Sequence, residues 1–177
     1  MLDADAFRCL HGLKLLDLVL SALARMTSVS VTEYIARHEL NLLSREIGRL
    51  ESSGLLRVEI VIAGSAAGKR FREFRRVADK GEAEAIAWAL DFASEERPLF
   101  VTRDKGATRF AQEQRVPVTD VLGAIVEACE LGELAPEVAR QALVVWDDPQ
   151  VQLCRPAQYT GLDAEWARRV SSRAAWA

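Results

Sequence analysis

The chain has 177 residues, half of them hydrophobic, and a net charge of −3 at neutral pH. That length and apolar content suit one domain with a sizeable core. The slightly negative charge excludes a surface that binds nucleic acid through bulk positive charge, so such a partner would need a local basic patch or a bound cation.

The first half of the chain predicts a buried helix over residues 13–23, which are apolar on most of their surface, and a strand over residues 26–31. Thr32 is the predicted cap of the next helix, which ends before Gly54. An apolar row identifies that helix: Ala36, Leu40, Leu43, Ile47 and Leu50. Residues 57–63 predict a second strand, and residues 64–76 (GSAAGKRFREFRR) predict a loop.

In the second half, Asp79 and Glu82 fit a capping box that opens a helix over residues 81–93. Strands are predicted over residues 99–102 and 116–118, and helices over residues 107–114, 121–131 and 136–144. This alternation predicts an α/β fold with a mainly parallel central sheet flanked by helices. Residues 1–145 form the single predicted domain, and residues 146–177 are interpreted as a C-terminal extension.

The cysteines and histidines favour neither a zinc site nor a disulfide framework. Cys9, Cys129 and Cys154 lack CxxC spacing, and His11 and His38 lie far apart in the sequence. The start, MLDADAF, does not resemble a signal peptide, and no apolar run reaches the roughly 18 to 20 residues of a membrane span. We therefore expect a soluble cytoplasmic protein with reduced thiols.

Four acidic residues are candidates for a site, and two of them, Asp3 and Asp104, occupy positions where ligands bind in parallel sheets, beyond the carboxyl ends of strands. Asp104 directly follows a predicted strand in LFVTRDKG, and Asp3 follows the first two residues in LDADAF. Glu39 borders the apolar row of its helix, and Glu84 lies one turn inside the next predicted helix. A carboxylate beside an apolar face needs a partner.

Carboxylates gathered at one pole would raise one another's pKa values unless a divalent cation offset their repulsion. Ligands that are all oxygen suit Mg²⁺ or Mn²⁺. Such an ion activates a water and stabilises the charge that builds on a phosphodiester during cleavage. The acidic set therefore predicts phosphodiester hydrolysis.

Four segments in order, LDADAF, VSVTEYIARHEL, GEAEAIAWAL and LFVTRDKGATRFAQEQRVPVTDVLGAIVEACELG, resemble the PIN-domain family of metal-dependent ribonucleases, which includes VapC-type toxins. The resemblance covers most of residues 1–143 and implies a compact α/β fold, Mg²⁺ or Mn²⁺, and cleavage of RNA. By position it implies catalytic roles for Asp3, Glu39, Glu84 and Asp104, with Asp3, Glu84 and Asp104 as metal ligands. By analogy it also implies a homodimer, and an antitoxin partner if the protein is a toxin.

Further residues are candidates near these acids. Four are expected to contact the substrate: Thr102, Arg103, Lys105 and Arg109. Thr102 matches the hydroxyl residue that often precedes the last acid of the family by two positions. Asp5 is an alternative to Asp3 as the first acid, Glu82 competes with Glu84 for the third position, and Asp120 is either an N-cap or a fifth acid.

Each assignment has a structural alternative. Asp104 can pair with an adjacent base, Asp3 can cap a helix, and Glu39 can pair with an arginine on its own helix. The basic residues within 69–76, interleaved with Phe71 and Phe74, can form a solvated loop or can contact RNA or an acidic protein.

Two other functions compete with the ribonuclease. The first is a catalytically degenerate PIN-like module that binds RNA or a protein without cutting. The second is an aspartate-nucleophile phosphotransferase, because DADAF contains the Asp-x-Asp pattern of such enzymes.

Overall fold

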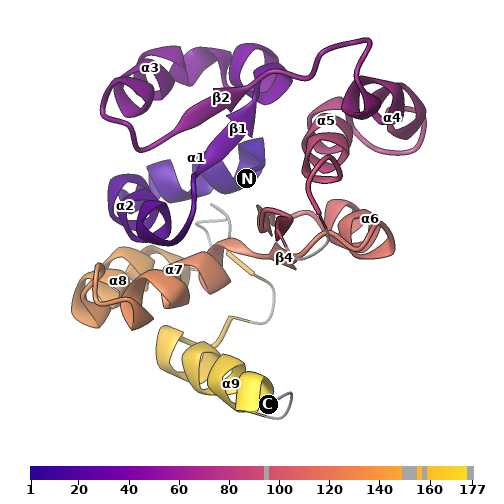
Figure 1. The fold of residues 1–177 in the computed structure, drawn as a ribbon. Coiled ribbons are helices and arrows are strands. Elements are labelled where there is room, and N and C mark those ends of the chain that lie inside the picture. Colours follow the sequence, from indigo (N-terminus) through magenta and orange to yellow (C-terminus); the bar gives the residue numbers. More distant parts are fainter. Residues whose placement is uncertain (94–95, 149–154, 157–158, 175–177) are drawn as a thin grey trace.

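The computed structural model describes residues 1–93, 96–148, 155–156 and 159–174, and it is mostly helical with short strands (Figure 1). The helices are α1 (Ala4–Gly12), α2 (Leu16–Met26), α3 (Ser44–Ser52), α4 (Ala66–Phe74), α5 (Lys80–Ala89), α6 (Lys105–Glu113), α7 (Val121–Glu130), α8 (Pro136–Leu143) and α9 (Leu162–Ala174). The strands are β1 (Ser30–Thr32), β2 (Arg57–Glu59), β3 (Phe100–Val101) and β4 (Val118–Thr119). The predicted helices over residues 107–114, 121–131 and 136–144 are therefore confirmed with small shifts of their ends.

The strands form two small parallel sheets, whereas the sequence predicted one central sheet. β1 pairs with β2, with Val31 opposite Val58, and β3 pairs with β4, with Phe100 opposite Val118. The parallel pairing is confirmed. A single sheet does not form across the described residues. Leu2 lies in space between β1 and β3, and it makes only an isolated bridge to Val101 of β3.

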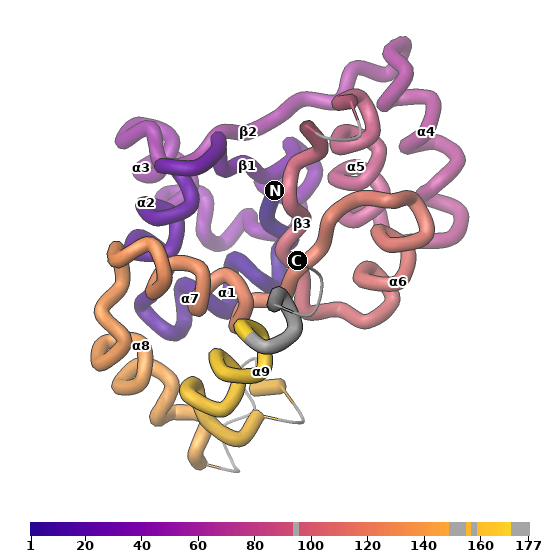
Figure 2. The backbone as a smooth tube through the Cα atoms, turned by 60° about the horizontal axis from the view of Figure 1, so that its bottom comes forward, coloured from indigo at the N-terminus to yellow at the C-terminus, as the bar shows by residue number. Residues whose placement is uncertain are grey.

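The first three residues nevertheless hydrogen-bond to both sheets, and Figure 2 shows the N-terminus between β1 and β3. The Leu2 N–H donates to the Ser30 carbonyl at 2.8 Å, and the Asp3 N–H donates to the Val101 carbonyl at 3.0 Å. Leu2 is fully buried. This short segment therefore fixes Asp3 beside β3 without a complete strand in front of it.

The predicted helix after Thr32 is broken at Leu40. A π-helical turn (Ile35–Glu39) and a 3₁₀ turn (Asn41–Leu43) precede α3. Thr32 ends β1 and does not cap this helix, and the Leu40 N–H donates to the Ile35 carbonyl at 2.8 Å, which is the five-residue spacing of a π turn. The apolar row is still directed inward, since four of its members are buried: Ala36, Leu40, Ile47 and Leu50.

The loop predicted over residues 64–76 is wrong, because most of it forms α4. The Ser65 hydroxyl accepts the Gly68 N–H at 3.0 Å and caps the helix. Figure 1 shows α4 beside α5, and Phe74 at its end packs edge-on against Phe110 of α6, with ring centroids 5.1 Å apart. Apolar residues at helical spacing therefore outweigh the glycines and the charge of this segment.

The segment after residue 145 takes part in the core. Trp146 is fully buried, and Leu162 at the start of α9 is 3% exposed. Figure 1 shows α9 below α7 and α8, where the Trp166 indole N–H donates to Glu130 at 3.1 Å. The C-terminal extension is therefore not a separate appendage in the parts that the structure describes.

The cysteines and the membrane prediction can be compared with the structure only in part. Cys9 and Cys129 are buried thiols, and Cys154 lies outside the described residues. Among the residues described, no helix combines the length and the apolar character that a bilayer crossing requires.

The burial of Trp146 yields a stability prediction. Trp146→Ala should lower the free energy of unfolding by about 3–5 kcal/mol, because it removes a large side chain from the core. Val144→Ala, in the same 3₁₀ turn but 59% exposed, should change it by less than about 0.5 kcal/mol. Urea unfolding of both variants measures the difference, and equal small effects would show that residue 146 lies outside the core.

Candidate functional site

Acidic side chains from distant parts of the chain line one cavity of about 390 Å³, which we call the acid cavity. Its lining residues are Asp3, Ala4, Asp5, Tyr34, Glu39, Asp79, Lys80, Glu82 and Asp104. The structure thus brings together Asp3, Glu39 and Asp104, which the sequence proposed as catalytic. The fourth, Glu84, does not line this cavity.

Glu84 and Glu82 have different environments on α5. Glu84 is 7% exposed, and its Oε2 accepts the Tyr34 N–H at 2.9 Å, so its carboxylate ties α5 to the start of the π turn. Glu82 is half-buried and lines the acid cavity. The sequence favoured Glu84 because a capping role already explained Glu82. In the structure, Glu82 contacts the N-terminus of α5 and also lines the acid cavity.

Asp3 and Asp104 each cap a helix while lining the acid cavity. Asp3 Oδ1 accepts the Ala4 N–H at 2.7 Å at the start of α1. Asp104 Oδ1 accepts the Ala107 N–H at 2.8 Å at the start of α6. The structural alternative for Asp3 is therefore realised, and it does not remove the carboxylate from the cavity.

The other two carboxylates meet the N-terminus of α5. The Gly81 N–H hydrogen-bonds to the Glu39 carboxylate, and the Asp79 N–H hydrogen-bonds to the Glu82 carboxylate. Each bond acts to lower the pKa of its carboxyl, against the larger effect of burial, which raises it. The Glu82 bond is one half of the expected capping box. A Cβ atom on Gly81 would lie 2.4 Å from Glu39 Oε1, so glycine permits this close approach. Three helix N-termini, with their partial positive charge, thus converge on the acid cavity.

Thr102 links two of the acids. It is 1% exposed, and its hydroxyl donates to Asp3 Oδ2 at 3.0 Å. The Thr102 hydroxyl oxygen also accepts the Asp104 N–H at 3.1 Å. Thr102 was expected to contact substrate. Its buried position instead makes it a residue that positions Asp3 relative to Asp104.

The pKa values of three cavity carboxylates are raised despite these hydrogen bonds. Burial, and to a smaller extent the charges of Asp5 and Asp104, raise the pKa of Asp3. Burial and the charge of Asp3 raise the pKa of Glu39. Burial, followed by Asp3, Asp104 and Asp79, raises the pKa of Glu82 to about 7. The carboxylates therefore repel one another across the cavity.

Cations and an aromatic ring at the rim were not identified from the sequence. The Lys80 ammonium lies 5.7 Å from the centroid of the Tyr34 ring, and both residues line the cavity. Arg8 donates to Asp5 Oδ1 at 2.8 Å and also to the Glu39 backbone carbonyl. Asp5 is exposed and paired in this way, whereas Asp3 is buried, which favours Asp3 as the first acid. The ion pair between Asp5 and Arg8 could have been predicted from the sequence, because residues three apart lie on the same face of a helix.

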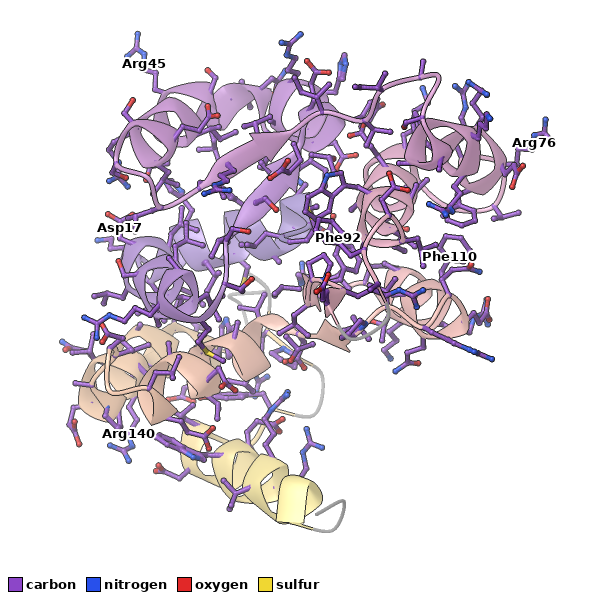
Figure 3. The ribbon with its side chains drawn as sticks, viewed as in Figure 1. Asp17, Arg45, Arg76, Phe92, Phe110 and Arg140 are labelled. Atoms are coloured by element: carbon purple, nitrogen blue, oxygen red, sulfur yellow. The ribbon has the colours of Figure 1, made fainter. Side chains whose placement is uncertain are left out.

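Two further cavities contain arginines and lie near Asp104: one shares lining residues with the acid cavity, and the other is lined by the two sequence neighbours of Asp104. Arg109 lines a cavity of about 690 Å³ together with Arg75 and Arg76. This cavity shares Asp79, Glu82 and Asp104 with the acid cavity, and Glu113 is a fourth carboxylate in its lining. We call it the arginine cavity; Figure 3 shows Arg76 at the outer end of α4 and Phe110 on α6 below it. Arg109 also pairs with Glu113 at 3.6 Å.

The second cavity, of about 640 Å³, is lined by Arg103 and Lys105, the residues directly before and after Asp104 in the sequence. Asp120 belongs to this cavity and not to the acid cavity. Its Oδ1 caps α7 by accepting the Gly123 N–H at 2.7 Å, and it pairs with Arg169 at 2.7 Å. The N-cap interpretation of Asp120 therefore describes its position, and the structure does not bring it to the other acids.

The donor atoms and charge of the acid cavity fit a hard divalent cation, because the donors are carboxylate oxygens and the pKa values of Asp3, Glu39 and Glu82 are raised. Their positions do not form a finished coordination shell: in the described parts of the chain, no three Asp, Glu, His or Cys side chains are grouped so that they could hold a metal ion. Binding would require these side chains to turn toward a common point.

Comparison with known proteins adds no relative: no family model, curated protein or solved structure matches this chain. The resemblance to PIN domains therefore depends on the sequence motifs alone.

The raised pKa of Glu82 predicts a pH-dependent stability. The folded state holds this proton more tightly than the unfolded chain, whose carboxyl has its ordinary value of 4.5, so the unfolding free energy falls as pH rises from about 4.5 to about 7. Glu82→Gln should remove this loss and raise Tm at pH 8 by roughly 2–4 °C, for a gain of about 1 kcal/mol after solvent screening.

Glu84→Ala serves as the matched variant on the same helix. It leaves the Tyr34 N–H without its acceptor, so it should lower the unfolding free energy by about 1–3 kcal/mol at every pH. Thermal melts of both variants without divalent metal test the pair. A Tm for Glu82→Gln at or below that of the wild type at pH 8 would contradict the repulsion.

Proposed function

We propose that this protein is a PIN-like endoribonuclease that depends on Mg²⁺ or Mn²⁺ and uses the acid cavity as its site. One observation carries the proposal: carboxylates at the N-termini of α1, α5 and α6 line one cavity, although capping alone does not require them to share it. Burial and mutual repulsion raise the pKa values of Asp3, Glu39 and Glu82, and a bound cation would offset this electrostatic cost.

Asp3, Glu82 and Asp104 would hold the cation, and Glu39 lines the same cavity with its carboxylate against the Gly81 backbone. The bound ion would supply a water of lowered pKa and would neutralise charge on the phosphodiester. Glu82 replaces Glu84 in this assignment, because the Glu84 carboxylate is engaged by the Tyr34 N–H. With a pKa of about 7, Glu82 is half protonated near neutral pH and gives up a proton when the cation binds.

Other residues prepare the site. Thr102 holds Asp3 and Asp104 in a fixed relation through its hydroxyl. Arg75, Arg76 and Arg109 line the arginine cavity, which opens on Glu82 and Asp104, and they would bind phosphates next to the one being cleaved. Glu39 is a general-base candidate because its pKa is raised toward neutrality.

A second candidate function is a PIN-like module that binds RNA or protein without cutting it. The observation that favours it is the spacing of the carboxylates, which in the described residues form no ready group of three metal ligands. An antitoxin partner and a homodimer stay predictions from the resemblance.

An RNA cleavage assay tests the proposal. The purified chain with Mn²⁺ should cleave a labelled RNA, and EDTA should abolish cleavage. Asp104→Asn and Glu82→Gln should each lower the rate by about 100-fold or more, because each removes a negative charge from the cation site.

Glu84→Gln is the control, since it keeps an oxygen that can accept the Tyr34 N–H and lies outside the acid cavity. Its rate should stay within a few-fold of the wild type. Cleavage that is insensitive to Asp104→Asn, or no cleavage in Mn²⁺ or Mg²⁺, would contradict the ribonuclease and favour the binding module.

A further inference from the structure

The cavity of about 640 Å³ beside Arg103 and Lys105 is lined by three segments of the chain, residues 102–112, residues 118–120 and the C-terminal segment, and we call it the basic cleft. Arg103 and Lys105 come from the turn that starts α6, and Arg155, Arg168 and Arg169 come from the C-terminal segment. Among its described lining residues, Asp120 is the one carboxylate. In a chain of net charge −3, this is a local concentration of positive charge.

Arg169 of α9 ties that helix to the start of α7, and so it fixes one wall of the cleft. Its guanidinium pairs with Asp120 at 2.7 Å and with Glu165 at 2.7 Å, and it is mostly buried. A Cβ atom on Gly123 would lie 2.6 Å from Arg169 Nη1, so the missing side chain of Gly123 lets the guanidinium lie against α7. Asp120 is thereby neutralised, and α9 is fixed with Arg168 at the cleft.

The remaining cations are available to a ligand. Arg103, Lys105 and Arg155 are exposed, and Arg168 is exposed while it pairs with Glu165 of its own helix. The other polar side chains available in the lining are the hydroxyls of Thr108 and Thr119 and the amide of Gln112, since the buried Thr102 hydroxyl is engaged by Asp3. Val118 and Pro156 complete the lining. Cations interspersed with short polar groups match phosphate and sugar, whereas a protein partner would need an apolar or aromatic anchor.

The basic cleft and the acid cavity meet the same turn of the chain. Asp104 lines the acid cavity, and its two neighbours, Arg103 and Lys105, line the cleft. A strand that passes over this turn from Asp104 would bring further phosphates toward these two cations. Thr102, whose hydroxyl holds Asp3, also forms part of the wall of the cleft.

We propose that the basic cleft binds the phosphates of a single-stranded RNA, and that the C-terminal segment completes this binding site through Arg155 and Arg168. The choice of ligand rests on the proposed ribonuclease function, but the binding itself does not require cleavage. Arg169 is a positioning residue, since its charge is engaged by Asp120 and Glu165.

Salt-dependent binding tests the proposal. Fluorescence anisotropy of a fluorescein-labelled 20-nucleotide single-stranded RNA is measured in EDTA at several KCl concentrations. In the Arg155→Gln/Arg168→Gln variant, the slope of log affinity against log salt should become shallower by about 0.7 for each phosphate that the protein no longer neutralises. Arg155→Gln alone, which leaves α9 untouched, should give half of this effect.

The matched control is Arg45→Gln/Arg57→Gln, which removes the same charge from α3 and β2. Both arginines are exposed, and Figure 3 shows Arg45 at the end of the molecule away from α9. This control should keep the wild-type slope. Equal slopes in the two double variants, or no binding of this RNA by the wild type, would overturn the proposal and leave an acidic protein as the ligand to consider.

The two proposals fail separately. A protein that binds RNA through the cleft but never cleaves it in Mn²⁺ would remove the ribonuclease and keep the cleft. A protein that cleaves RNA while the Arg155→Gln/Arg168→Gln variant binds like its control would keep the ribonuclease and overturn the cleft.

Discussion

The arrangement of the whole site depends on hydrogen bonds between carboxylates and the backbone at helix N-termini. Asp3 and Asp104 cap α1 and α6, and Glu39 and Glu82 meet the first N–H groups of α5. The backbone of Asp3 is in turn held beside β3 by its bond to Val101. Because each of these helices begins at the same cavity, the groups that start the helices are also the groups that concentrate negative charge.

This arrangement couples stability to charge. An aspartate cap contributes about 0.5–2 kcal/mol to its helix, and the positive end of the helix favours the ionised form. Burial and mutual repulsion oppose that gain, as the raised pKa values of Asp3 and Glu82 indicate. A divalent cation would retain the caps and remove the repulsion. Arginines of the arginine cavity, which Asp104 also lines, and the cations of the basic cleft, which include its neighbours Arg103 and Lys105, lie near these acids.

The sequence predicted the features that depend on local patterns. Periodicity and caps located α6, α7 and α8, and the position after a strand identified Asp104. The predictions failed where tertiary packing determines the backbone conformation. The π turn before α3 places Glu39 beside Gly81, and α4 forms where contacts with α5 and Phe110 stabilise it. The choice of Glu84 over Glu82 depended on capping alone, and the position of Glu82 at both its own helix start and the cavity depends on tertiary packing. Arg168 and Arg169 could not be assigned because their place in the basic cleft depends on the packing of α9.

The ionisation of Glu82 tests the shared cavity most directly. The side-chain carboxyl carbon of Glu82 can be followed by NMR through a pH titration, with and without Mg²⁺. The account predicts a pKa of about 7 without metal and a much lower value when Mg²⁺ is bound. An ordinary glutamate pKa in both titrations would contradict the claim that Asp3, Glu82 and Asp104 form one electrostatic site for a cation.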